Sequence, residues 1–172
     1  MPGSIVLLTG RSFSGKSTAA ALLGAALPAT TLAYDAINAE RGLRSGDGVP
    51  VAEWLRTNDE AHERARTLLA DGAAVVVDDT SSPRFLRDGW RRLAREAGAS
   101  FVLVLVDVDP AEIRRRWTAN RASGGRHDVT DEVMAAHLAA FETPGVDEPH
   151  LRWTGSADDG ALVEAVRTAL RR

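Results

Sequence analysis

The residues with the clearest chemical meaning form one run near the start of the chain, Gly10-Arg11-Ser12-Phe13-Ser14-Gly15-Lys16-Ser17-Thr18. The run fits the phosphate-binding loop pattern of a glycine, four free positions and then Gly-Lys-Ser. Gly10 and Gly15 allow backbone angles that a side chain would forbid, so successive N–H groups can turn inward around a phosphate. Lys16 would place an ammonium on the terminal phosphates, and Ser17 would offer a hydroxyl to Mg²⁺. The whole run is therefore predicted to bind a nucleoside triphosphate.

Asp78 and Asp79 follow the apolar run Ala73–Val77, where a phosphate-loop protein places its second magnesium-organising carboxylate. Side chains alternate along a strand, so the two carboxylates should point to opposite faces. One of them is then expected to reach the metal directly, and the other could face the acceptor. Capping of the following helix is the alternative role for these carboxylates.

Asp35 is predicted to end a second strand over Thr30–Tyr34. A carboxylate there would lie across the cleft from the phosphate loop, where it could orient an acceptor hydroxyl and take its proton. The alternative is a helix cap for the residues from Ala36 onward. The glycine-rich loop 42–50 that follows is either a mobile connection or part of the acceptor pocket.

Arginines gather on one later stretch, after Asp107 and around the pair Gly124-Gly125; they are Arg114, Arg115, Arg116, Arg121 and Arg126. This cluster predicts a lid, around residues 114–130, that closes over the triphosphate and donates guanidiniums to the transferring phosphoryl group. Helical spacing cannot put three consecutive arginines on one face, so one or two should point at the nucleotide.

The elements that must position these residues follow from hydrophobic patterning. Five short apolar runs alternate with helix-like stretches, which is typical of an α/β parallel sheet covered by helices on both faces. The runs are Ser4–Thr9, Thr30–Tyr34, Ala73–Val77, Ser100–Val106 and Leu151–Trp153, and the helical stretches are 18–27, 51–70, 84–97, 110–122, 130–141 and 159–170. Ligands on such sheets bind beyond the carboxyl ends of the strands, where the candidate residues fall. The 172 residues are expected to form a single domain, 1–172.

Composition narrows the function classes. The formal net charge is −3, which provides no strong field for nucleic acid, and the absence of cysteine excludes thiolate chemistry and disulfides. No apolar run approaches the length of a membrane span, and the chain begins directly with its first apolar run. A cytoplasmic protein is therefore expected.

With these residues in view, the chain resembles the small phosphate-loop kinases related to the kinase domain of phage-type polynucleotide kinase, which include short bacterial proteins with AAA-type ATP-binding domains. The likeness rests on stretches that together cover most of the chain. They are Gly10–Thr18, Tyr34-Asp35-Ala36-Ile37, Val77-Asp78-Asp79-Thr80-Ser81 with Arg87 downstream, Asp109-Pro110-Ala111-Glu112 leading to Arg116 and Arg121, and Phe141-Glu142-Thr143-Pro144 before Asp147-Glu148.

The resemblance implies a five-stranded sheet of order 2-3-1-4-5 with a helical lid. It implies that Lys16, Asp35, Arg116 and Arg121 serve catalysis. Ser17, Asp78 and Asp79 would serve the metal, and the loop that starts at Gly155 would hold the base. The implied reaction moves the γ-phosphoryl group of ATP or GTP, with Mg²⁺, to a hydroxyl group.

The predicted function is therefore a phosphotransferase that acts on a small-molecule hydroxyl. One alternative is a polynucleotide 5′-hydroxyl kinase, which the lack of a basic stripe with interleaved aromatics outside the lid disfavours. Another is a nucleotide-binding switch or NTPase without a phospho-acceptor. The identity of the acceptor, the choice between ATP and GTP, and the oligomeric state are left open.

Overall fold

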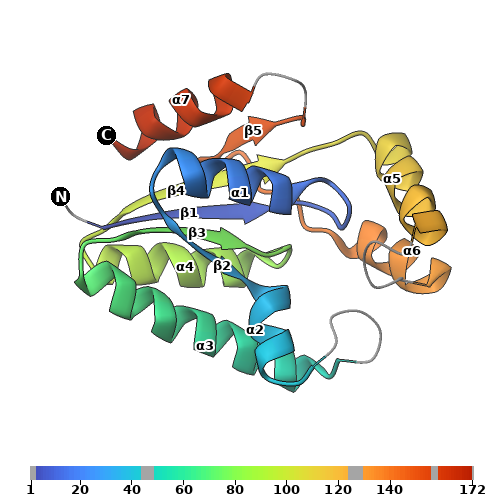
Figure 1. Ribbon diagram of the computed structural model, residues 1–172, viewed down its shortest axis with the longest axis horizontal. Helices are drawn as coiled ribbons and strands as arrows, with labels where there is room; N and C mark the ends of the chain where they lie inside the picture. Colours follow the sequence, from blue (N-terminus) through green and yellow to red (C-terminus); the bar gives the residue numbers. More distant parts are fainter. Residues whose placement is uncertain (1–2, 44–48, 124–129, 156–158, 172) are drawn as a thin grey trace.

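The computed structural model describes residues 3–43, 49–123, 130–155 and 159–171. Its core is a five-stranded, all-parallel sheet of order β2-β3-β1-β4-β5 (Figure 1). The strands are β1 (Ser4–Thr9), β2 (Thr30–Ala33), β3 (Ala74–Asp78), β4 (Ser100–Val106) and β5 (Leu151–Trp153). The helices are α1 (Lys16–Ala26), α2 (Tyr34–Glu40), α3 (Val51–Ala70), α4 (Arg84–Glu96), α5 (Pro110–Ser123), α6 (Asp131–Ala140) and α7 (Asp159–Leu170). The predicted fold class and strand order are confirmed.

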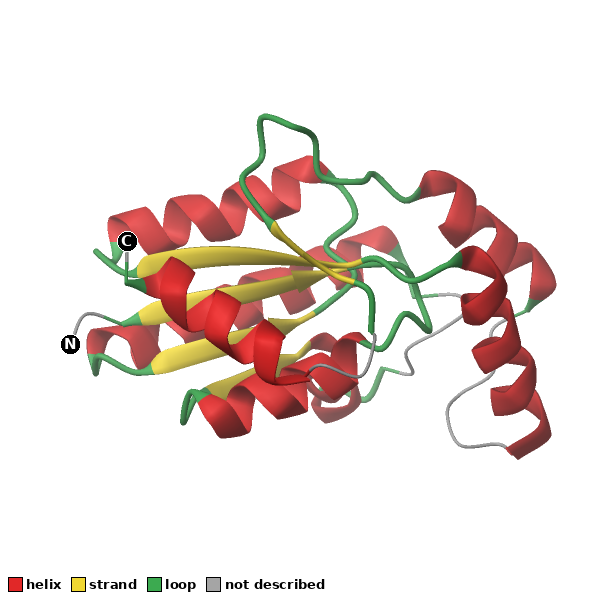
Figure 2. Cartoon of the chain, turned by 90° about the horizontal axis from the view of Figure 1, so that it is seen from above, coloured by secondary structure: helices red, strands yellow, loops and turns green. Residues whose placement is uncertain are grey.

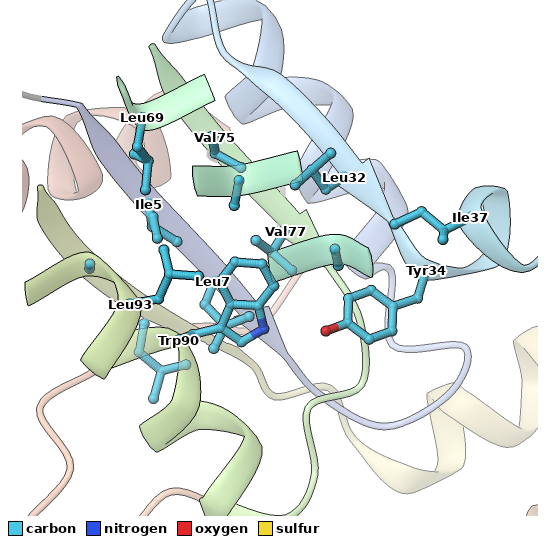
Figure 3. Close-up of a cluster of buried hydrophobic side chains, with 14 residues drawn as sticks. Ile5, Leu7, Leu32, Tyr34, Ile37, Leu69, Val75, Val77, Trp90 and Leu93 are labelled. Atoms are coloured by element: carbon cyan, nitrogen blue, oxygen red, sulfur yellow. The ribbon is translucent and has the colours of Figure 1, made fainter. Parts of the chain in front are cut away.

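The sheet lies between two helical layers, as Figure 2 shows from above. Side chains alternate along each strand, so one strand supplies both layers. Ile5 and Leu7 of β1 belong to the cluster formed with α2, α3 and α4, which is drawn in Figure 3. Val6 and Leu8 belong to the cluster formed with α1, α5 and α7. Both clusters are buried, and their burial fixes the register in which the strand ends meet the site.

The start of α2 corrects the sequence analysis. The second strand ends at Ala33 and a helix begins at Tyr34, so Asp35 lies in the first turn of α2 and does not end a strand. The physical reason is burial at helical spacing, because Tyr34 and Ile37, which are 3% and 2% exposed, pack together into the core. The N-cap of α2 is Ala33, so Asp35 does not cap this helix. A carboxylate in the first turn is nevertheless favourable to the helix dipole.

Helices α5 and α6 form an arm that extends beyond the sheet at the carboxyl ends of the strands (Figure 1). We call residues 110–123 and 131–140 the α5–α6 arm. A return segment, residues 141–150, leads from the end of α6 back to β5. Within the described residues, no helix combines the length and apolarity needed to cross a membrane.

Candidate active site

The phosphate loop connects β1 to α1, and its two glycines are each needed for a different reason. Gly15 is the N-cap of α1 and has φ +100°, a left-handed conformation that a side chain would strain. Gly10 passes so close to β4 that an added Cβ would lie 2.6 Å from the carbonyl oxygen of Val106. The loop can therefore approach the sheet edge only with glycine at this position.

Lys16 lies within the curve of this loop. Its Nζ donates hydrogen bonds to the carbonyl oxygens of Gly10, at 2.9 Å, and Arg11, at 3.0 Å. The ammonium also acts on Asp79. Burial raises the pKa of the Asp79 carboxyl, while hydrogen bonds from Ser81 and the charge of Lys16 oppose that shift. The positive charge at the phosphate loop therefore favours the ionised form of Asp79.

Asp79 is held in place by the turn after β3. Its Oδ2 accepts hydrogen bonds from the backbone N–H of Ser81, at 2.7 Å, and from the Ser81 hydroxyl, at 2.8 Å. Asp79 also acts on Tyr34, whose pKa is raised first by burial and second by this carboxylate. The Tyr34 hydroxyl in turn donates to Asn58 Oδ1 at 2.7 Å. Asp79 therefore faces the layer of α2 and α3.

Asp78 takes the other face. Val75 and Val77 point into the cluster beneath α3 and α4, whereas Val76 points toward α1, so alternation puts Asp78 on the α1 side. Ser17 lies in the first turn of α1 on that same side. The N-cap of α4 is Pro83, and the side chain that accepts from the first N–H of this helix, at Arg84, is Glu142 through Oε2 at 3.0 Å. The structure therefore gives no support to the alternative in which Asp78 caps α4.

Among the arginines of α5, Arg116 is the one with a described hydrogen bond to the phosphate loop. Its Nη1 donates to the carbonyl oxygen of Ser14 at 2.9 Å, and Glu112 orients the group by accepting from Nε at 2.7 Å. Glu112 belongs to a stretch that carries the family resemblance, but no role was predicted for it, although its spacing of four residues before Arg116 is the signal that could have identified one. Arg114 and Arg115 are exposed.

Arg121 points elsewhere. Its guanidinium stacks on the Trp117 ring, with the central carbon 4.3 Å from the ring centroid, and pairs with Asp131 of α6. These contacts hold the α5–α6 arm together. The proposed catalytic role of Arg121 remains a prediction, and Arg126 lies outside the described residues.

Two adjoining pockets meet at Arg116 and Gly155. One, of about 310 Å³, is lined by Phe13, Ser14, Gly15, Thr18, Arg116, Trp153 and Gly155. The other, of about 590 Å³, is lined by Asp107, Val108, Asp109, Pro110, Glu112, Arg115, Arg116, Arg152, Thr154 and Gly155. The predicted base-binding loop continues into residues 156–158, outside the described part of the chain. Trp153 was not assigned a site from the sequence, and its isolated position there carries no signal.

Asp35 is exposed, at the same edge of the sheet as the phosphate loop because every strand is parallel. Its carboxylate forms no hydrogen bond or ion pair with another described residue. It is therefore open to a molecule bound at this edge. The neighbouring residues 44–48 of the glycine-rich loop are among those that the structure does not describe.

No group of three or more metal-ligating acids or histidines occurs in residues 3–43, 49–123, 130–155 and 159–171. A hydroxyl such as Ser17 and a carboxylate such as Asp78 fit Mg²⁺ when phosphate oxygens and water complete its shell.

Known proteins resemble this chain in sequence and in fold. The sequence profile of an AAA domain family, AAA_33, matches residues 5–144. No curated protein matches the chain. The structure of the Mycobacterium tuberculosis APS kinase CysC, in complex with AMPPNP and APS, superposes with a TM-score of 0.75 at 24% identity over 99% of both chains.

Two further solved structures extend the likeness. A gluconokinase from Sinorhizobium meliloti 1021 superposes with a TM-score of 0.63 at 21% identity, over 99% of this chain and 93% of that one. Chaetomium thermophilum Kti12, in complex with ADP-AlF3, superposes with a TM-score of 0.78 at 16% identity, over 96% of this chain and 98% of that one. At these identities the likeness concerns the fold. Because the profile match runs from β1 through the phosphate loop to the return segment, the chain belongs to the AAA domain family AAA_33, and it has the fold of the small phosphate-loop kinases.

Proposed function

We propose that the protein is a Mg²⁺-dependent kinase that transfers the γ-phosphoryl group of ATP or GTP to a hydroxyl of a small molecule. The observation that carries this proposal is the convergence of Lys16, Asp79 and Arg116 on one phosphate loop. Phosphoryl transfer needs positioning and charge neutralisation more than covalent chemistry. The names of the APS kinase and the gluconokinase with this fold support the same reaction class.

On the donor side, the backbone N–H groups of residues 10–17 would hold the phosphates at the N-terminus of α1. Lys16 would move from its loop carbonyls onto the terminal phosphate oxygens, and Arg116 would neutralise charge that develops on the transferred group. The base would occupy the pockets that meet at Gly155. Ser17 and Asp78 would hold the magnesium ion, which offsets phosphate charge when bound.

On the acceptor side, Asp35 would orient the hydroxyl and accept its proton at a carboxylate oxygen. Asp79, between Lys16 and Tyr34, would line the acceptor side and keep Lys16 in register. The α5–α6 arm would act as the lid and exclude water, which protects the phosphoryl group from hydrolysis. This role of the arm follows from the hydrogen bond between Arg116 of α5 and Ser14 of the phosphate loop.

The test is a phosphorylation screen with γ-labelled ATP and GTP across nucleosides, sugars, aminoglycosides and a 5′-hydroxyl oligonucleotide. Label in a small molecule supports the proposal. Label in the oligonucleotide alone would reassign the acceptor class. Hydrolysis without any labelled acceptor, over the whole panel, would favour an NTPase and contradict the proposal.

Asp35→Asn tests the acceptor assignment directly. A general base contributes roughly 10²–10⁴-fold, so kcat should fall by that range while nucleotide affinity stays near the wild-type value. Asp71→Asn is the matched control. Asp71 is an exposed aspartate at the C-terminal end of α3, just before β3 begins, so it lies at the edge of the sheet opposite the phosphate loop. Unchanged turnover in Asp35→Asn would show that this carboxylate is not the base.

A further inference from the structure

Arg87 is an unusual arginine because its side chain is fully buried, at 0% exposure, near the start of α4. It forms a two-point ion pair with Glu148 of the return segment, which is 2% exposed. Arg87 Nε donates to Glu148 Oε1 at 3.0 Å and Nη2 donates to Oε2 at 2.7 Å. Such a buried pair carries a large desolvation cost, so its retention calls for a specific role.

The remaining nitrogen of the Arg87 guanidinium, Nη1, contacts both the turn after β3 and the return segment. Its Nη1 donates to the carbonyl oxygens of Ser81, at 3.0 Å, of Ser82, and of Glu142, at 3.0 Å. Ser81 and Ser82 belong to the turn after β3, and Glu142 belongs to the return segment. One guanidinium therefore fastens the turn after β3 to the chain that leaves the α5–α6 arm.

The turn after β3 is also fastened to the phosphate loop. The carbonyl oxygen of Thr80 accepts from the Thr9 hydroxyl, at 2.8 Å, and from the backbone N–H of Gly10, at 3.3 Å. Ser81 donates two hydrogen bonds to Asp79, one from its backbone N–H and one from its hydroxyl. A continuous chain of contacts thus runs from Glu148 through Arg87 and Ser81 to the Asp79 carboxylate.

The other end of this chain of contacts is the root of the arm. The Ser82 hydroxyl accepts from the backbone N–H of Glu142 at 2.9 Å. Phe141, the first residue of the return segment, lies against Arg11 of the phosphate loop, with the guanidinium carbon 4.9 Å from the ring centroid. Displacement of the return segment would therefore shift both the turn after β3 and the phosphate loop.

We propose that Arg87 and Glu148 form a positioning pair that holds the Asp79 carboxylate in place through Ser81 and fixes the root of the α5–α6 arm to the phosphate loop. This inference rests on the proposed function. The pair touches neither nucleotide nor acceptor in the proposed reaction, and it acts through Ser81 and the return segment. Its loss displaces the Asp79 carboxylate while the phosphate loop stays folded.

The test is a double-mutant cycle of Glu148→Gln and Asp79→Asn, measured well below the unfolding temperature of each variant. Glutamine keeps the shape of Glu148 and removes its charge. We expect kcat to fall by roughly 10- to 100-fold in Glu148→Gln, since a misplacement of about 1 Å can cost 10²-fold, with a much smaller change in KM for ATP. The two losses should be strongly non-additive, because both variants disturb the same carboxylate.

Asp147→Asn is the matched control. Asp147 pairs with Arg84 at 2.7 Å and joins the same two segments one residue away, yet the two side chains are 62% and 43% exposed. This variant should keep kcat within about twofold of wild type. Arg87→Lys, which keeps the charge but not the two-point geometry, serves if Glu148→Gln does not fold, and it should show the same kcat loss.

Additive losses in the cycle, or a Glu148→Gln variant with normal kcat, would overturn the positioning role. A wild-type protein that phosphorylates no acceptor would instead refute the proposed function. In that case the affinity for MgATP is measured for the same set of variants. Additive changes in affinity would overturn the positioning role of the pair, and coupled changes would support it.

Discussion

The environment of His62 predicts that acid lowers the stability of the folded protein. This histidine of α3 lies at the edge of the Trp90 ring, with the two ring centroids 4.2 Å apart and the ring planes at 78°. Burial lowers the pKa of His62 to about 4, and the guanidinium of Arg66 adds to the effect. Asp59 and Glu63 act in the opposite direction, and Arg92 of the facing helix supports the lowering. The folded protein therefore keeps the imidazole neutral where an unfolded chain would protonate it.

Proton linkage gives the direction and the size of this change in unfolding free energy with pH. Because the pKa is depressed in the folded state, the stabilisation is fully present above the unfolded value of about 6.5 and is lost as pH falls toward 4. Between pH 7.5 and pH 5 the two pKa values correspond to about 2 kcal/mol of unfolding free energy. The imidazole is only partly buried, so solvent screening reduces the expectation to about 1 kcal/mol.

The assay is urea denaturation at pH 7.5 and pH 5, compared between wild type and His62→Gln. Other carboxylates titrate in this range in both proteins, so the difference between their pH dependences isolates His62. We expect the wild type to lose about 1 kcal/mol more than the variant on acidification. Equal losses in the two proteins would show that the buried imidazole is not the source.

Three further predictions concern the loop and its neighbours. Arg116→Ala should weaken nucleotide affinity or kcat by about tenfold, whereas Arg115→Ala should change neither, because both guanidiniums bind Glu112 but Arg116 also donates to the Ser14 carbonyl of the phosphate loop; equal effects in a titration with fluorescent ATP would contradict this. Gly10→Ala should destabilise the fold by about 1–3 kcal/mol in thermal or urea unfolding and abolish nucleotide binding, since its Cβ meets the Val106 carbonyl; normal nucleotide binding would refute it. Tyr34→Phe should cost about 1–2 kcal/mol in urea unfolding by removing the hydrogen bond to a partly buried amide, and an unchanged midpoint would refute that.

The carboxyl edge of the sheet could be located from local sequence. Each strand in the core is a short apolar run, and the phosphate loop is a contiguous motif whose glycines encode its backbone path, so β1, the loop and α1 follow from neighbouring residues alone. The alternation of Asp78 and Asp79 was likewise predictable, because it follows from the two-residue period of a strand. Tyr34 was harder to place, because a tyrosine fits a strand or a buried helix turn equally well and only its packing with Ile37 chose the helix.

The pairings between distant segments could not be predicted in the same way. Arg116 and Ser14 are 102 residues apart, and Arg87 and Glu148 are 61 apart, so their contacts depend on how the α5–α6 arm returns to the sheet. The consecutive arginines 114–116 cannot be distinguished by sequence alone. The direction of α5 decides that Arg116 contacts the phosphate loop, and that Arg121, further along the helix, stacks on Trp117. The sequence by itself determined the phosphate loop, the sheet and the chemistry present at its edge, because those depend on short-range patterns. Tertiary structure decided which charges meet there, because contact between residues far apart in the chain depends on packing that no local pattern specifies.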